Sequence, residues 1–177
     1  ACAGAADAIR FFAGLGLAPI EAPSIVVTPS LPVQAGPSAA GAFVEQHRRS
    51  YILPYARFKA MDSWFGVRIE RRMYRSLAAH ETAHALAAHH FALPRPTIQA
   101  KEYIAYVAMF CAMQAQLRVQ ALRATPGTGF AHESHITAVL YLFDPMRFGA
   151  EAYRHFIRPE AGAPFVKAVL EGKALRD

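Results

Sequence analysis

The stretch SLAAHETAHALAAHH, residues 76–90, constrains the fold of this chain more than any other part of it. It places four histidines and one glutamate in a run of alanine and leucine, residues with high helix propensity. The small alanines would let such a helix pack deep in the domain, where unpaired polar groups are costly to bury. We therefore expect a buried helix whose polar side chains share a partner.

Three residues of this stretch, His80, Glu81 and His84, form the pattern H-E-x-x-H. Residues four apart lie on one face of a helix, so both imidazoles can bind one metal ion. Catalytic zinc sites have three protein ligands and a water, whose pKa the metal lowers. The pattern predicts a Zn²⁺ site with Glu81 as the general base that activates the zinc-bound water.

Two residues compete for the position of third ligand. If a second helix returns antiparallel after FALPRP, it would bring Glu102 over the metal. The residues around Glu102 are apolar enough for this part of the helix to be buried. The alternative is His90, which stands where the longer pattern H-E-x-x-H-x-x-G-x-x-H has its third histidine, with Met146 as a possible Met-turn residue. That pattern needs a glycine where this chain has Ala87, which favours continuing the helix. We prefer Glu102.

HETAHAL followed by KEYIAYV resembles the gluzincins, the thermolysin-like and aminopeptidase-like zinc peptidases, over roughly residues 60–110. The chain looks most like their small, minimal members, which have a short sheet ahead of the active-site helix. The resemblance implies that His80, His84 and Glu102 bind zinc and that Glu81 is the base. Thermolysin-like enzymes carry an acidic residue at the position of Tyr106, and its carboxylate orients a ligand histidine. The tyrosine puts that orienting hydrogen bond in doubt for this chain.

The resemblance leaves the group that stabilises the transition state open. HESHITAVLYLFDP supplies His132, His135 and Tyr141, any of which could polarise a carbonyl or hold an oxyanion from the far side of a cleft. No spacing rule selects one of them, and a structural role is the stronger interpretation for each.

The 177 residues are near the usual size of one domain, and we expect a single metallopeptidase-like domain over 1–177. Residues 1–60 read as a first helix followed mainly by strands, and 61–177 as mainly helical. The expected fold class is α+β, with a short antiparallel sheet in the N-terminal part. The helices of the second part are expected at about 67–91, 97–123, 132–143, 145–157 and 160–173, with Asp144 capping the fourth and Pro145 in its first turn.

The start ACAGAADA is what removal of a signal peptide would leave, so we expect an exported protein, periplasmic or secreted. Its two cysteines, Cys2 and Cys111, would then pair as a disulfide. No segment is apolar enough to span a membrane. The net charge of +6 is scattered rather than gathered in a stripe, so we expect no nucleic-acid partner.

Together these features predict a small exported zinc metallopeptidase that hydrolyses a peptide or protein substrate. The alternative is an inactive zinc-holding binding or structural protein of the same fold. The presence of Glu81 favours the enzyme, whereas the small size of the chain favours the alternative.

Overall fold

The computed structural model describes residues 1–33, 35–36 and 39–176, and it confirms the predicted α+β class. In chain order the elements are α1 (Cys2–Gly14), β1 (Ser24–Val27), β2 (Gly41–Val44), the 3-10 helix η1 (Glu45–His47), β3 (Arg49–Ile52), α2 (Tyr55–Lys59), β4 (Ser63–Trp64), β5 (Val67–Arg68), α3 (Arg71–Ala88), α4 (Ile98–Ala112), α5 (Ala115–Ala124), the 3-10 helix η2 (Glu133–His135), α6 (Ala138–Phe143), α7 (Pro145–Phe156) and α8 (Gly162–Leu170).

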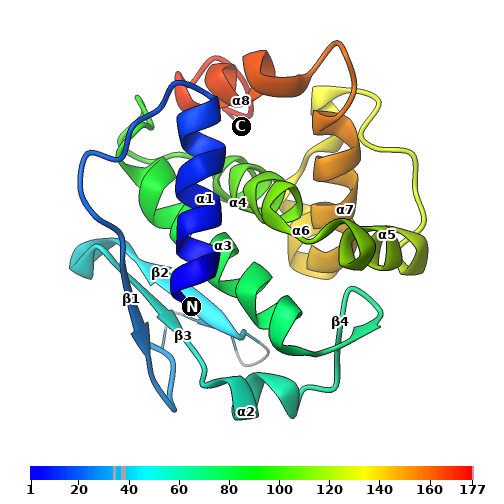
Figure 1. The fold of residues 1–177 in the computed structure, drawn as a ribbon. Helices are drawn as coiled ribbons and strands as arrows, with labels where there is room; N and C mark the ends of the chain where they lie inside the picture. The colour runs from blue at the N-terminus through cyan, green and yellow to red at the C-terminus, as the bar shows by residue number, and fades with distance from the viewer. Residues whose placement is uncertain (34, 37–38, 177) are drawn as a thin grey trace.

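The central element is α3, which carries residues 71–88 (Figure 1). Helices α1 and α4 pack along it, and the three-stranded sheet packs against it as well. The close approach of α1 depends on Gly4, because a β-carbon there would lie 2.2 Å from the carbonyl oxygen of Arg75. Alanines of α3 that are fully buried, Ala78, Ala79 and Ala83, let its neighbours come equally near. The predicted buried helix is therefore present.

The three-stranded sheet has the order β1-β3-β2 and is mixed, so the prediction of a purely antiparallel sheet was wrong. Strand β2 pairs antiparallel with β3, but β1 lies on the other side of β3 and pairs with it in parallel, with Val27 opposite Ile52. The connection between β1 and β2 carries the chain across the sheet, which no local sequence pattern reveals. A second sheet consists of the short antiparallel pair β4 and β5.

Two of the expected helices differ from the structure. The helix predicted at 97–123 is broken, because Met113 and Gln114 are extended, and α5 then turns to bury Leu117 and Ala121. The helix predicted at 132–143 begins only at Ala138, after Thr137 caps it by accepting a hydrogen bond from the Leu140 amide. The start of α7 agrees with the prediction, with Asp144 as its N-cap and Pro145 in its first turn.

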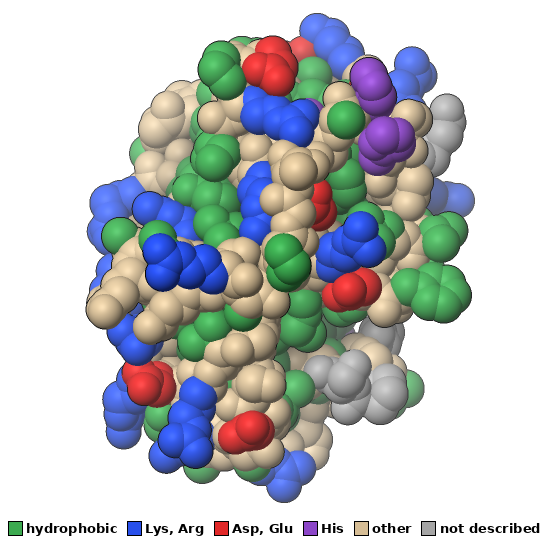
Figure 2. All heavy atoms as spheres, turned by 90° about the vertical axis from the view of Figure 1, so that its right-hand side faces the viewer, with side chains coloured by type: hydrophobic (Ala, Val, Ile, Leu, Met, Phe, Trp, Pro, Cys, Tyr) green, Lys and Arg blue, Asp and Glu red, His purple; other side chains and the backbone are tan. Residues whose placement is uncertain are grey.

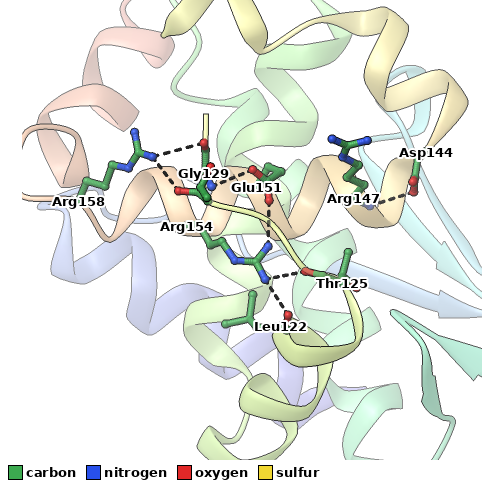
Figure 3. A network of polar contacts seen from close by, with 9 residues as sticks. Leu122, Thr125, Gly129, Asp144, Arg147, Glu151, Arg154 and Arg158 are labelled. Atoms are coloured by element: carbon green, nitrogen blue, oxygen red, sulfur yellow. Dashed lines mark hydrogen bonds and ion pairs between the residues drawn. The ribbon is translucent and has the colours of Figure 1, made fainter. Parts of the chain in front are cut away.

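The segment between α5 and α6 is held to α7 by a network of arginines (Figure 3). Arg154 pairs with Glu151 at 3.0 Å and donates to the carbonyls of Leu122 and Thr125. Glu151 also accepts from the Gly129 amide at 2.8 Å. Arg158, just beyond the end of α7, donates to the carbonyl of Gly129 and to those of its two neighbours, Thr128 and Phe130. These bonds satisfy backbone groups at the end of α5 and in residues 125–130, which form no helix or strand.

The predicted disulfide is absent from the structure, where both cysteines are free thiols. Cys2 is exposed at the start of α1, whereas Cys111 is half-buried near the end of α4. Burial raises the pKa of the Cys111 thiol to about 12, which keeps it protonated and unreactive.

Lys and Arg side chains are spread over the face shown in Figure 2, among apolar and acidic groups, rather than gathered in one stripe. This distribution agrees with the scatter of basic residues along the sequence. Among the described residues, no helix combines the length and apolar character needed to cross a membrane.

Candidate metal centre

The first two residues of the candidate site lie on one face of α3, at positions 80 and 84. The helix extends over both because its sequence from Ser76 to Ala88 consists largely of alanine and leucine, and it ends before LPRP. His80 is buried and His84 nearly so, with 8% and 12% of their side chains exposed. The hydroxyl of Ser50 in β3 donates to the carbonyl of Glu81 at 2.7 Å and fixes this part of α3 against the sheet.

Glu102 comes from α4, the helix that returns alongside α3. Thr97 starts α4 by accepting a hydrogen bond from the Ala100 amide, directly after the proline-containing connection. Glu102 then falls in the second turn, buried, and faces the two histidines. The return of a second helix after FALPRP is the arrangement that the sequence predicted.

The three side chains converge on one point. The Nε2 atoms of His80 and His84 are 3.2 Å apart, and each lies 3.5 Å from a carboxylate oxygen of Glu102. One ligand atom from each residue can be chosen so that all lie within 4.8 Å of one another. No other group of three or more His, Cys, Asp or Glu in the described part of the chain has this geometry. The group could hold a metal ion.

The charges of the three side chains suit a cation. The pKa of His84 is lowered to about 4, chiefly by burial, so its imidazole is neutral near pH 7 and is free to bind a metal. Burial alone would raise the pKa of Glu102, but His84, His80 and a hydrogen bond from Tyr141 lower it below its ordinary value. A neutral His84 and an ionised Glu102 therefore face one another, while, against the effect of burial, the hydrogen bond and charge of Glu102 raise the pKa of His80, which must lose its proton before it can bind a metal.

Three buried polar atoms at this site have no hydrogen-bond partner: Nδ1 of His80, Oε2 of Glu81 and Oε2 of Glu102. They are three of the four buried side-chain atoms in this condition among the described residues. Since buried polar groups are almost always paired, such a concentration points to a partner that binds here. A cation would satisfy the carboxylate of Glu102.

Glu81 lies beside the group without being part of it. Its pKa is raised to about 7, chiefly by burial, with a smaller contribution from the charge of Glu102. Strand β2 passes directly over its carboxylate, since a β-carbon on Gly41 would lie 2.5 Å from Oε1 of Glu81. The carboxylate is thus held between the helix and the edge of the sheet.

The site opens into a pocket of about 530 Å³. Strand β2 and the start of η1 line one side of it, and α3, the connection to α4 and the first turns of α4 line the other. We call the three converging residues, His80, His84 and Glu102, the metal group. All three line the pocket, and so do Glu81 and Tyr141. The metal group and Glu81 are therefore open to the same pocket.

Three of the residues that the sequence suggested for transition-state stabilisation or for orienting a ligand have different positions relative to the pocket. Tyr141 of α6 lines the pocket and its hydroxyl donates a hydrogen bond to Glu102. Tyr106 is buried, with its ring centroid 4.5 Å from that of His80, so it packs on this imidazole and leaves Nδ1 without a hydrogen-bond partner. His135 is exposed in η2, next to His132, and does not line the pocket.

The alternative third ligand, His90, lies outside the metal group. Its Nε2 is 3.1 Å from the carbonyl oxygen of Ala18, and its ring stacks on Phe12 of α1. Met146, the residue assigned to a Met-turn in that alternative, accepts a hydrogen bond from the Phe65 amide through its sulfur. Both residues have structural contacts of their own.

Sequence reasoning missed the second wall of the pocket. Gly41 and Phe43 of β2 lie close to the metal group only because the sheet folds back onto α3. The sequence did contain one signal for this contact. A glycine in a strand often marks a position where another group approaches the backbone closely, and Gly41 stands at the start of β2. Lys101 and the apolar residues of the α3–α4 connection also line the pocket, and no motif marks them.

The chain belongs to a family of unknown function, DUF6639, whose model matches residues 1–177. Neither the curated proteins nor the solved structures yield a match to this chain. The geometry of the site is therefore the basis for assigning a function.

Proposed function

We propose that this protein is a zinc-dependent peptidase of the gluzincin type, with His80, His84 and Glu102 as ligands and Glu81 as the general base. The observation that carries the proposal is the convergence of these ligands beside a buried carboxylate that has an unpaired oxygen. Other buried polar clusters of the described chain, such as Glu151 with Arg154, have their hydrogen-bond partners.

Zinc is the metal that this donor set favours. Two imidazoles and one carboxylate are a known ligand set of catalytic zinc, which leaves a position for water or substrate. In a tetrahedral site with bonds of about 2.0–2.1 Å, ligand atoms lie about 3.3 Å apart. The distances of 3.2 and 3.5 Å among the three residues are close to that value. The two imidazoles lie near different oxygens of Glu102, and one donor atom from each residue can be chosen within 4.8 Å, so the side chains must draw together to bind the ion.

Bound zinc would supply a Lewis acid that polarises a carbonyl and lowers the pKa of a water. Glu81 accepts one proton from the attacking water, and the water oxygen forms a bond with the carbonyl carbon. The C–N bond then breaks, and Glu81 transfers its proton to the leaving amine.

A peptide can bind along β2, which is an edge strand of the described sheet. Strand β2 pairs with β3 on one side only, and its residues Gly41, Ala42 and Phe43 line the pocket. Backbone groups on the open side are available to an extended peptide, which would add as a further strand. This supports a peptide rather than a small ester or sugar as the substrate.

Replacing Glu81 by glutamine tests the proposal. The amide keeps the size of the side chain but cannot accept the proton, so hydrolysis of a mixed peptide library should fall at least about a hundredfold. Zinc content and thermal unfolding should stay at wild-type values, because Glu81 is not a ligand. Glu160→Gln is the matched control, since Glu160 is exposed and outside the pocket.

Equal cleavage by Glu81→Gln and wild type would show that Glu81 is not the base. If zinc-loaded wild type cleaves no peptide of the library, the inactive zinc-holding protein replaces the peptidase as the better account.

A further inference from the structure

We infer that the pocket receives the C-terminal residue of a peptide, with Lys101 binding the terminal carboxylate and an apolar compartment holding the last side chain. The inference rests on the proposed function and makes the peptidase a carboxypeptidase. It comes from two features of the pocket that take no part in metal binding or proton transfer.

The first feature is the apolar compartment. His80, His84 and Ala88 follow one another at intervals of one turn on the pocket face of α3, so Ala88 lies about 6 Å beyond His84 along the helix. From there the wall is apolar through the connection to α4 and ends at Ile98, which keeps 40% of its surface exposed. The residues that line this part are Ala88, Phe91, Leu93, Pro94, Pro96 and Ile98. An apolar side chain would bury itself here.

The second feature is the position of Lys101. Helix geometry places Ile98, Lys101 and Glu102 within about 100° of one another around α4, with Lys101 between the other two in height. All three line the pocket. Lys101 therefore shares the pocket with both the metal group and the apolar compartment, and its positive charge is near enough to His84 to lower the pKa of that imidazole.

The Lys101 ammonium has no ion-pair or hydrogen-bond partner among the residues that the structure describes. The other charged residue of the pocket outside the metal group and Glu81 is Glu45, on the opposite wall in η1, and it has no ion pair with Lys101. A carboxylate entering the pocket would form a charge-assisted hydrogen bond with Lys101. The free amine of an N-terminal residue would instead be repelled there.

The spacing fits one residue. Consecutive α-carbons are about 3.8 Å apart, so the carboxylate of a last residue lies about one residue length from the bond that joins it to the chain. The distance of about 6 Å from His84 to Ala88 therefore accommodates one residue beyond the metal group. With the bond at the metal group, the last side chain would enter the apolar compartment and its carboxylate would reach Lys101.

Binding can be measured apart from turnover in zinc-loaded Glu81→Gln. The probes are acetyl-Ala-Ala-Leu with a free C-terminal carboxylate and the same peptide with a C-terminal amide, titrated by calorimetry. The free acid should bind at least about tenfold more tightly than the amide, the effect expected of one charge-assisted hydrogen bond. Adding Lys101→Met should remove this difference, Lys101→Arg should retain most of it, and the exposed Lys59→Met should leave it unchanged.

Equal affinity for acid and amide, or an unchanged difference in Lys101→Met, would overturn the inference. So would a wild-type enzyme that cleaves internal bonds of amidated peptides as fast as it releases a free C-terminal leucine. In that last case peptide hydrolysis stands and only the assignment of Lys101 fails. Lack of cleavage by wild type, with the difference in affinity intact, would instead contradict the proposed function.

Discussion

Gly41 of β2 and Glu81 of α3 are in such close contact that a β-carbon on Gly41 would lie 2.5 Å from Oε1 and 2.7 Å from Cδ of Glu81. The glycine therefore fixes how closely the edge strand covers the proposed base. A side chain at position 41 must displace the carboxylate or the strand. The contact links the sheet to the chemistry proposed for α3.

Gly41→Ala should lower peptide hydrolysis by about tenfold to a hundredfold, since a small displacement of a catalytic group has effects of this size. Zinc content should remain at the wild-type level, because the three atoms nearest to a β-carbon at position 41 all belong to Glu81, which is not a ligand. Gly14→Ala is a suitable control, as a β-carbon there meets nothing within 4 Å. Full activity of Gly41→Ala would mean that the position of Glu81 is not restricted by β2.

The convergence of His80, His84 and Glu102 could be predicted from the sequence because its geometry is mostly local. The spacing of His80 and His84 fixes their common face, and the proline-containing connection places Glu102 opposite them on the returning helix. The N-cap at Asp144 is local in the same sense. Such features depend on a few neighbouring residues, and these were predicted correctly.

The features that were missed depend on contacts between distant segments. The parallel pairing of β1 with β3 and the position of Gly41 over Glu81 follow from how the sheet folds onto α3. The break at Met113 has no proline or glycine to mark it, and the burial of Leu117 and Ala121 favours it. The disulfide was expected from the presence of two cysteines in a chain taken to be exported, without any information on the surroundings of the two thiols.

Arg154 should be important for stability. Its side chain and that of Glu151 are only 14% and 11% exposed, so Arg154→Met would leave a buried carboxylate without its partner, together with two carbonyl groups. Loss of one partner of a buried ion pair destabilises a protein by about 3 kcal/mol or more. Urea unfolding measures the change in the free energy of unfolding.

Arg147→Met on the same helix is the control for this substitution (Figure 3). Arg147 is exposed, and only its backbone amide takes part in a hydrogen bond, to Asp144. We expect a change within about 0.5 kcal/mol for this variant. Similar effects of the two substitutions would show that the network around Glu151 contributes little.

The two thiols should differ strongly in reactivity. With a pKa of about 12, only about one Cys111 thiol in ten thousand is ionised at pH 8, and burial also limits access to it. Native protein treated with iodoacetamide at pH 8 should be modified at Cys2 and should react at Cys111 only after unfolding. Peptide mapping by mass spectrometry identifies the modified residue. Equal modification of both thiols, or a Cys2–Cys111 bridge in protein purified without reductant, would contradict the structure at this point.

The most direct test of the account is the zinc content of the purified chain, measured by inductively coupled plasma mass spectrometry after expression without chelators. We predict one zinc per chain for wild type and for His90→Ala, and loss of zinc for His84→Ala and Glu102→Ala, since only the latter two remove members of the converging group. Circular dichroism should show that all variants are folded. Retention of zinc by Glu102→Ala together with its loss in His90→Ala, or wild-type protein that binds no stoichiometric zinc, would contradict the account.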